Sequence, residues 1–172
     1  MTAVLITDRL TLRAPIQSDL EALHAIFSDP RAMRYWSHPA HEDMARTQET
    51  LEGMIASHRD TGLEFVIERD GVVIGKAGLW RVAELGYILH PDHWGQGLIA
   101  EALRPIIAAA WARFDSLDAI TAEIDPRNTR SARVLNALGF VLTHAAKETI
   151  EVNGEWCDSA YYALQRRAPA PR

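Results

Sequence analysis

Hydrophobic positions recur along the chain with two spacings, which distinguish predicted strands from predicted helices. Apolar residues that alternate with polar ones predict strands, and apolar residues three or four positions apart predict helices. The pairs Asp70-Gly71 and Asn153-Gly154 predict tight turns between neighbouring strands. The predicted strands cover residues 5–14, 63–69, 72–82, 84–90, 119–124, 140–151 and 155–164, and the predicted helices cover 18–27, 42–58, 97–114 and 128–138.

The order of these elements predicts the fold class. One strand precedes two helices and three strands, and a helix, a strand, a helix and two final strands follow. A strand–helix–strand unit flanked by hairpins predicts an α/β fold with a mixed sheet of about seven strands and about four helices. We expect one domain over residues 1–167 and a frayed tail over the Pro/Ala/Arg-rich residues 168–172.

Composition narrows the class of protein without identifying it. Hydrophobic residues make up 48% of the chain and charged residues 24%, as in ordinary globular domains. The net charge of −5 argues against nucleic acid as a partner. Because Cys157 is the single cysteine, an intramolecular disulfide is excluded and a cysteine-based zinc site is not expected. We expect no metal cofactor. The sequence has neither a signal-peptide pattern nor an apolar run of about 18 residues, so we expect a cytoplasmic protein with no membrane partner.

Two glycines mark the segment with the clearest chemical signal. Gly95 and Gly97 lie between the predicted strand 84–90 and the helix that begins at 97. Free amide groups at a helix start, together with the positive end of the helix dipole, can bind an anion such as phosphate. An ordinary glycine turn remains the alternative. No Gly-Lys-Ser/Thr follows, and Ala100 stands where a dinucleotide motif has its third glycine, so the known nucleotide loops do not match.

The segment Trp94-Gly95-Gln96-Gly97-Leu98-Ile99-Ala100-Glu101-Ala102 resembles the acetyl-CoA motif of the GNAT superfamily, and more narrowly that of its RimJ/RimL-like (ribosomal-protein N-terminal acetyltransferase) branch. Residues 7–13, 73–75, 128–132 and 138–140 also match, so the resemblance covers about residues 5–164. It implies a GNAT-like fold whose mixed sheet is splayed, and an N-acetyltransferase that uses acetyl-CoA as its co-substrate. The acceptor it implies is a protein N-terminal α-amine or a small-molecule amine.

The same resemblance assigns the cofactor-binding residues. The pantetheine arm would lie where the strand 84–90 splays from the strand 119–124, and the glycine loop would hold the pyrophosphate. The residues so implied are Ile88, Leu89, His90, Trp94, Gly95, Gln96, Gly97, Leu98, Ile99, Ala100, Glu101, Asn128 and Ser131.

Acetyl transfer to an amine needs a neutral amine, a stabilised carbonyl oxygen and a protonated leaving thiol. An α-amine with a pKa near 7.7–8.0 is roughly a tenth neutral at pH 7, so it needs little help from a base. Glu84 is the candidate base, acting through water, and a backbone N–H near Ile88 is the candidate oxyanion donor. The resemblance suggests Ser131 as the acid. Tyr35, Trp36 and Glu84 are the candidate acceptor-binding residues.

Each of these assignments has a structural alternative. Glu84 could be an ordinary exposed strand residue, Asn128 could do no more than cap its helix, and Ser131 could solvate the first helical turn. Tyr35 and Trp36 could pack against the sheet. The alternative function is a non-catalytic acyl-CoA sensor or interaction module on the same fold. A homodimer through the exposed final strand is left open.

Overall fold

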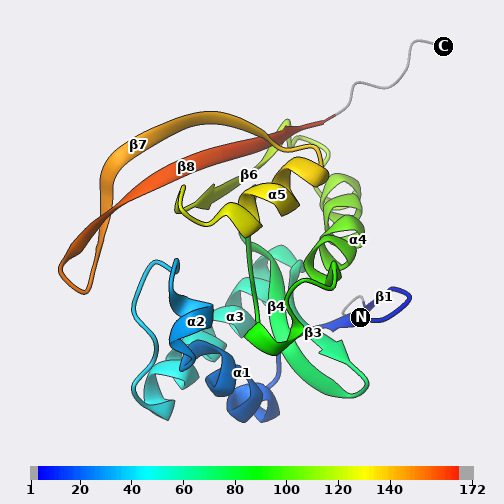
Figure 1. The fold of residues 1–172 in the computed structure, drawn as a ribbon. Coiled ribbons are helices and arrows are strands. Elements are labelled where there is room, and N and C mark those ends of the chain that lie inside the picture. The colour runs from blue at the N-terminus through cyan, green and yellow to red at the C-terminus, as the bar shows by residue number, and fades with distance from the viewer. Residues whose placement is uncertain (1–3, 167–172) are drawn as a thin grey trace.

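The computed structural model describes residues 4–166, which form one mixed sheet of eight strands with helices on both faces (Figure 1). The strand order is β1-β2-β3-β4-β5-β6-β8-β7, with β5 and β6 parallel and every other neighbouring pair antiparallel. The strands are β1 Leu5–Ile6, β2 Thr11–Arg13, β3 Glu64–Arg69, β4 Val72–Arg81, β5 Glu84–Leu89, β6 Ala119–Ile124, β7 Val141–Val152 and β8 Glu155–Gln165. The helices are α1 Leu20–Phe27, α2 Pro30–Met33, α3 Met44–Thr61, α4 Leu98–Arg113 and α5 Thr129–Ala137, with short 3-10 turns at Gln17–Asp19 and Pro91–His93.

The predicted mixed α/β sheet is confirmed, with two local differences. The expected first strand is interrupted by a turn in which the Thr7 amide donates to the Leu10 carbonyl, so it becomes β1 and β2. The short helix α2 was not predicted. Its start is fixed by Pro30 in the first turn and by the Asp29 side chain, which accepts from the Arg31 amide. The tail predicted for residues 168–172 lies outside the described residues.

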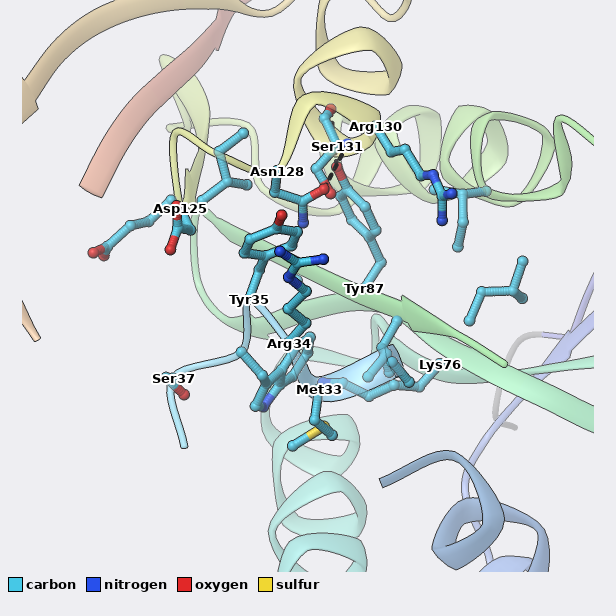
Figure 2. Close-up of a pocket in the computed structure, with 18 of the residues that line it drawn as sticks. Met33, Arg34, Tyr35, Ser37, Lys76, Tyr87, Asp125, Asn128, Arg130 and Ser131 are labelled. Carbon is cyan, nitrogen blue, oxygen red and sulfur yellow. Dashed lines mark hydrogen bonds between the residues drawn. The ribbon is translucent and has the colours of Figure 1, made fainter. Parts of the chain in front are cut away.

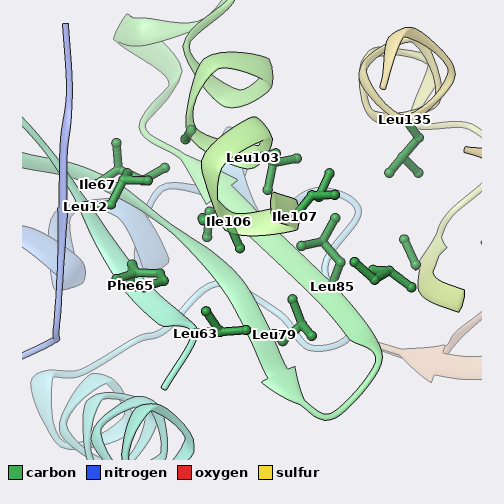
Figure 3. Packing of buried hydrophobic residues seen from close by; sticks show 14 of the residues in the cluster. Leu12, Leu63, Phe65, Ile67, Leu79, Leu85, Leu103, Ile106, Ile107 and Leu135 are labelled. Carbon is green, nitrogen blue, oxygen red and sulfur yellow. The ribbon is translucent and has the colours of Figure 1, made fainter. Parts of the chain in front are cut away.

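The two faces of the sheet bury separate hydrophobic clusters. The larger cluster packs α4 against one face, with Phe65, Leu79 and Ile106 fully buried (Figure 3). The smaller cluster packs α1 and α3 against the other face, around Phe27 and Leu51. Since burial of one such side chain contributes about 1.5–3 kcal/mol, both faces hold the strands firmly in place.

The parallel strands β5 and β6 separate soon after they meet. Among the described residues, the register between them contains the single pair Glu84 and Thr121. Beyond Glu84, the edge of β5 that faces β6 has no registered partner there, while its other edge stays paired with β4. The predicted splay between these two strands is therefore present, and it leaves backbone groups free to bind a ligand.

The last two strands form a long hairpin that extends past the rest of the sheet (Figure 1). We call β7, β8 and their turn the β7–β8 arm. Figure 1 shows the arm arching beyond β6 on the same side of the molecule as α2. Within residues 4–166, no helix is both long and apolar enough to cross a membrane.

Candidate active site

A large groove runs between the segment around α2 and the starts of α4 and α5. Its volume is about 2200 Å³, and it is lined by the segment around α2, by β5, by the starts of α4 and α5, and by the β7–β8 arm. Pockets for drug-sized ligands usually have about 300–1000 Å³. The groove therefore has room for a large cofactor together with a second substrate (Figure 2).

The glycine loop ends in an open helix start. Gly95 and Gly97 have φ angles of +74° and +73°, a conformation that strains residues with side chains. The first backbone bond of α4 runs from the Glu101 amide to the Gly97 carbonyl at 3.1 Å, which leaves the preceding amides of the first turn without an intrahelical partner. A Cβ atom at Gly97 would meet just the Arg9 side chain, at 3.9 Å, and one at Gly95 would meet nothing within 4 Å. The space in front of these amides is thus open to an anion.

The N-terminal segment holds this loop in position. Arg9 donates from Nη1 to the Gln96 carbonyl at 3.0 Å and from Nε to Glu101 Oε2 at 2.7 Å. Thr7 Oγ1 donates to Glu101 Oε1 at 2.6 Å. Burial alone would raise the pKa of Glu101, but the hydrogen bonds from Thr7 and Arg9 outweigh it and lower that pKa. The Gln96 side chain is held by Arg69. Glu101 and Gln96 therefore brace the loop with their side chains.

Trp94 and Arg130 connect the glycine loop to its neighbours. Trp94 donates from Nε1 to the Leu89 carbonyl at 2.9 Å, and the Arg130 guanidinium lies 4.3 Å from the centroid of the Trp94 indole. His90 follows β5 and accepts a 3.3 Å hydrogen bond from the Asp92 amide, which fixes the intervening turn. Sequence reasoning missed Arg130, which places a cation in the groove, against Trp94 at the start of the glycine loop.

Asn128, Ser131 and Tyr87 meet at the start of α5. The first two were predicted from the sequence, and Tyr87 was not. Asn128 accepts from the Ser131 amide at 3.1 Å, so its helix-capping role is present. The Tyr87 hydroxyl donates to the Ser131 carbonyl at 3.4 Å (Figure 2). Burial raises the pKa of Tyr87 to about 12, so this hydroxyl stays protonated at neutral pH. The sequence alone indicated Tyr87 only weakly. Tyr87 shares a strand face with Leu85 and Leu89, and a tyrosine in such a position is common in a hydrophobic core.

Glu84 and Ile88 lie on the same face of β5, as alternation predicted. Ile88 packs in the cluster beneath α1 and α3, and Glu84 begins the strand with its side chain 20% exposed. Arg81 donates from Nε and Nη2 to Glu84 Oε2, at 2.7 and 2.5 Å. The strand ends at Leu89, so His90 does not continue this face. Glu84 is therefore a paired, partly buried carboxylate at the groove.

Tyr35 and Trp36 lie in the wall of the groove nearest α2. The Trp36 ring packs edge-on against Phe27 at 6.1 Å and lies 5.7 Å from Lys76 Nζ. The Tyr35 ring lies 5.9 Å from the Arg127 guanidinium of the facing wall. Tyr35 and Trp36 therefore line the groove and also pack against neighbouring side chains, so both roles considered for them are present.

The groove collects most of the residues that the sequence singled out. Those that line it are Tyr35, Trp36, Glu84, Ile88, Leu89, Trp94, Gly95, Gly97, Leu98, Ile99, Ala100, Asn128 and Ser131. His90, Gln96 and Glu101 lie behind its wall, where their side chains hold the turn and the loop.

Comparison with known proteins agrees with this geometry. The family profile described as Acetyltransferase (GNAT) domain matches residues 9–141. The uncharacterized N-acetyltransferase p20 of Bacillus licheniformis is 28% identical over 95% of this chain and 96% of its own. The ribosomal-protein-serine acetyltransferase of Escherichia coli is 29% identical over 68% of this chain and 69% of its own. The structure of RimL, a ribosomal L7/L12 α-N-protein acetyltransferase in complex with coenzyme A, superposes with a TM-score of 0.81 at 21% identity, covering 95% of this chain and 98% of that one.

These matches confirm the resemblance that the glycine segment predicted, including its RimJ/RimL-like branch. The chain belongs to the GNAT family of acetyltransferases and is an N-acetyltransferase.

Proposed function

We propose that this protein transfers the acetyl group of acetyl-CoA to a primary amine, by direct attack while both substrates occupy the groove. One observation carries the proposal: an open helix start at Gly97 and the unpaired edge of β5 lie in the same groove as Glu84. The acceptor is a protein N-terminal α-amine or a small-molecule amine. The final strand β8 pairs with both β6 and β7, so the expectation that it is an exposed edge is wrong, and a homodimer through the edge of this sheet would use β7 instead. A homodimer and a cytoplasmic location remain predictions, and the mechanism needs neither.

The residues present fit acetyl-CoA. Gly95 and Gly97 leave room for a phosphate against the amides of Leu98–Ala100, and Arg130 adds a positive charge beside them. The free edge of β5 offers backbone groups to the pantetheine amides, near Ile88. Asn128 and Ser131 would line the arm from the side of α5.

When bound, acetyl-CoA supplies a thioester carbonyl that a neutral amine can attack, forming a C–N bond as the C–S bond breaks. The proton released by the amine passes through water to Glu84. An amide at the free edge of β5 near Ile88 donates to the carbonyl oxygen as negative charge develops there. These groups stand ready before reaction, so the chain does not need to reorganise around the developing charge.

The leaving thiolate needs a hydrogen-bond donor and finally a proton. Ser131 is the proposed acid, and Tyr87 is a second hydroxyl near the same helix start. Since the pKa of Tyr87 is about 12 and a thiol has a pKa near 8.5, Tyr87 would donate a hydrogen bond to the thiolate and keep its proton. A serine hydroxyl is a weaker acid than a tyrosine, so Ser131 would protonate the thiolate only as a relay that regains its proton from water.

Thermal unfolding with acetyl-CoA, ATP or NAD at matched concentrations tests the proposed cofactor. At a hundred times its dissociation constant, a ligand adds about 2.7 kcal/mol, which raises the midpoint of a protein of this size by roughly 5–10 °C. We expect a shift with acetyl-CoA alone, and CoA release when an amine is added. No shift would remove the cofactor from the proposal. Binding without CoA release across a wide amine panel would favour the acyl-CoA sensor.

Substitution Glu84→Gln tests the proposed base. Turnover should fall by about a hundredfold below pH 8, where most of the amine carries a proton, while the affinity for acetyl-CoA stays unchanged. Glu49→Gln is the matched control, because Glu49 also pairs with an arginine three residues away but lies outside the groove. A pH–rate profile of Glu84→Gln that overlays the wild type would exclude Glu84 as the base.

A further inference from the structure

We propose that the buried pair Glu64 and Lys76 selects acceptor amines that carry a neutral hydroxyl or carboxamide group. This inference rests on the proposed acetyl transfer and names the class of its acceptor. The two residues lie in the groove wall on the face of the sheet that α1 and α3 cover, away from the glycine loop.

The pair is buried but incompletely satisfied. Lys76 Nζ donates to Glu64 Oε1 at 2.6 Å, and the exposed fractions of the two side chains are 8% and 0%. Glu64 Oε2 is buried too, and within residues 4–166 it has no hydrogen-bond partner. Buried carboxylate oxygens almost always have a partner, because leaving one without a donor destabilises the fold. A ligand in the groove can supply the missing donor.

Two glycines lie between Glu64 and β5 in the sheet. In the strand register, Glu64 of β3 lies beside Gly78 of β4, and Gly78 lies beside Gly86 of β5. A Cβ atom at Gly86 would meet one atom, Cδ1 of Trp80, at an ordinary 3.5 Å, so the surface above Gly86 is open. A Cβ atom at Gly78, in contrast, would meet the Leu63 carbonyl oxygen and Glu64 Cα, because the β3 backbone approaches Gly78 closely. With strands about 4.8 Å apart, the Glu64 backbone lies roughly 10 Å from β5. An acceptor whose amine reacts beside β5 would thus reach Glu64 with a group several bonds away.

The chemistry of the pair defines that group. A carboxylate oxygen accepts hydrogen bonds and an ammonium donates them. A second ammonium on the acceptor would be repelled by Lys76, and a carboxylate would be repelled by Glu64, in a site with little water to screen either charge. An alkyl group would leave Glu64 Oε2 without a donor. A hydroxyl or carboxamide can donate to Glu64 and accept from Lys76, so a neutral group of this kind fits best.

The test compares amines that differ in one donor. Linear amino alcohols of two to four carbons are paired with their methyl ethers, and a tripeptide that begins with serine is paired with one that begins with O-methylserine. The value of kcat/KM is measured by CoA release. We expect the hydroxyl member to be preferred at least tenfold in the pair whose length fits, because a site built to bond a hydroxyl rejects an analogue that lacks the donor.

The substitution Glu64→Gln replaces the unpaired acceptor oxygen Oε2 by a hydrogen-bond donor. The glutamine oxygen can still accept from Lys76, which places an NH2 donor where Oε2 stood. The preference for the hydroxyl over the ether should then fall below twofold or reverse. Glu68→Gln is the matched control, since Glu68 lies on the same strand, accepts from Arg13 Nε at 2.8 Å and lies outside the groove. Its preference should equal that of the wild type.

A second variant covers the case in which Glu64→Gln fails to fold. Glu64→Met with Lys76→Met replaces the whole pair by apolar side chains of similar length, a change that folded proteins commonly tolerate. This variant should prefer the ether. Equal use of alcohol and ether by the wild type, or an unchanged preference in a folded variant, would overturn the inference alone. Acetyl-CoA binding without turnover of any amine would instead overturn the proposed function on which it rests.

Discussion

The two ends of the groove are built in different ways. The end where we propose that the cofactor binds, the cofactor end, is made of backbone: two glycines and the amides of Leu98–Ala100, braced by Arg9. The end where we propose that the acceptor binds, the acceptor end, is made of side chains that come from the segment around α2, from β3 and β4, from β5 and from the β7–β8 arm. A backbone site needs few particular side chains and lies within one short segment. A side-chain site depends on every element that contributes to it, so the acceptor can change while the cofactor stays the same.

The largest expected effect breaks the cofactor end alone. Gly97→Trp would fill the space in front of the α4 amides, and we expect the affinity for acetyl-CoA to fall at least a hundredfold, measured by calorimetry or by loss of the thermal shift. Gly71→Trp is the matched control. Gly71 has a φ of +79° against +73° at Gly97, and it too lies in open space, so the backbone strain is comparable. Equal affinities in the two variants would move the cofactor away from the glycine loop.

Sequence patterns predicted most of the fold because its elements have clear periodicity and turn residues. Alternation and the Asp70-Gly71 and Asn153-Gly154 turns located the hairpins β3–β4 and β7–β8, and the strand–helix–strand order located β5, α4 and β6. The helix α2 escaped because four residues carry no helical period. Its start depends on a proline and one capping side chain, which are equally common in turns.

The candidate site was predictable at its cofactor end for the same reason. Gly95 to Glu101 form one continuous motif, so their neighbourhood is fixed by the sequence itself. Glu64 and Lys76 are twelve residues apart, and they meet through the register of β3 on β4, which includes a bulge between Ile67 and Glu68. Alternation predicts which face a residue occupies in a regular strand, but it does not predict its partner across the hairpin. The acceptor end therefore required the structure.

The second prediction concerns the pH dependence of stability at the acceptor end, where His41 lines the groove. Burial, and then the charges of His38, Arg46 and His24, lower the pKa of His41 to about 4, while Asp43 acts weakly in the opposite direction. The unfolded chain takes up this proton near pH 6.5, so between about pH 6.5 and 4 the unfolded state binds more protons than the folded state. The free energy of unfolding should fall by about 2 kcal/mol from pH 7 to pH 5, measured by urea denaturation.

The variant His41→Gln is the control for this pH dependence. Glutamine does not titrate and can still bond to Thr47 Oγ1, which now lies 2.8 Å from His41 Nδ1. We expect the loss between pH 7 and pH 5 to shrink by most of the 2 kcal/mol. A loss of the same size in the variant would show that other groups cause it.

The smallest expected effect separates bracing from binding at the cofactor end. Arg9 donates to the Gln96 carbonyl and to Glu101, so Arg9→Ala should loosen both without touching the reacting groups. We expect the KM for acetyl-CoA to rise about tenfold with kcat unchanged, as for a loss of binding shared by the ground and transition states. Stability should change little, because an arginine whose side chain is 42% exposed gains little from its ion pair. Arg46→Ala is the control, since Arg46 is 54% exposed and pairs with Glu49 away from the groove. If Arg9→Ala lowers kcat at constant KM, the N-terminal segment acts on the reaction itself, and the cofactor end depends on side chains as much as the acceptor end does.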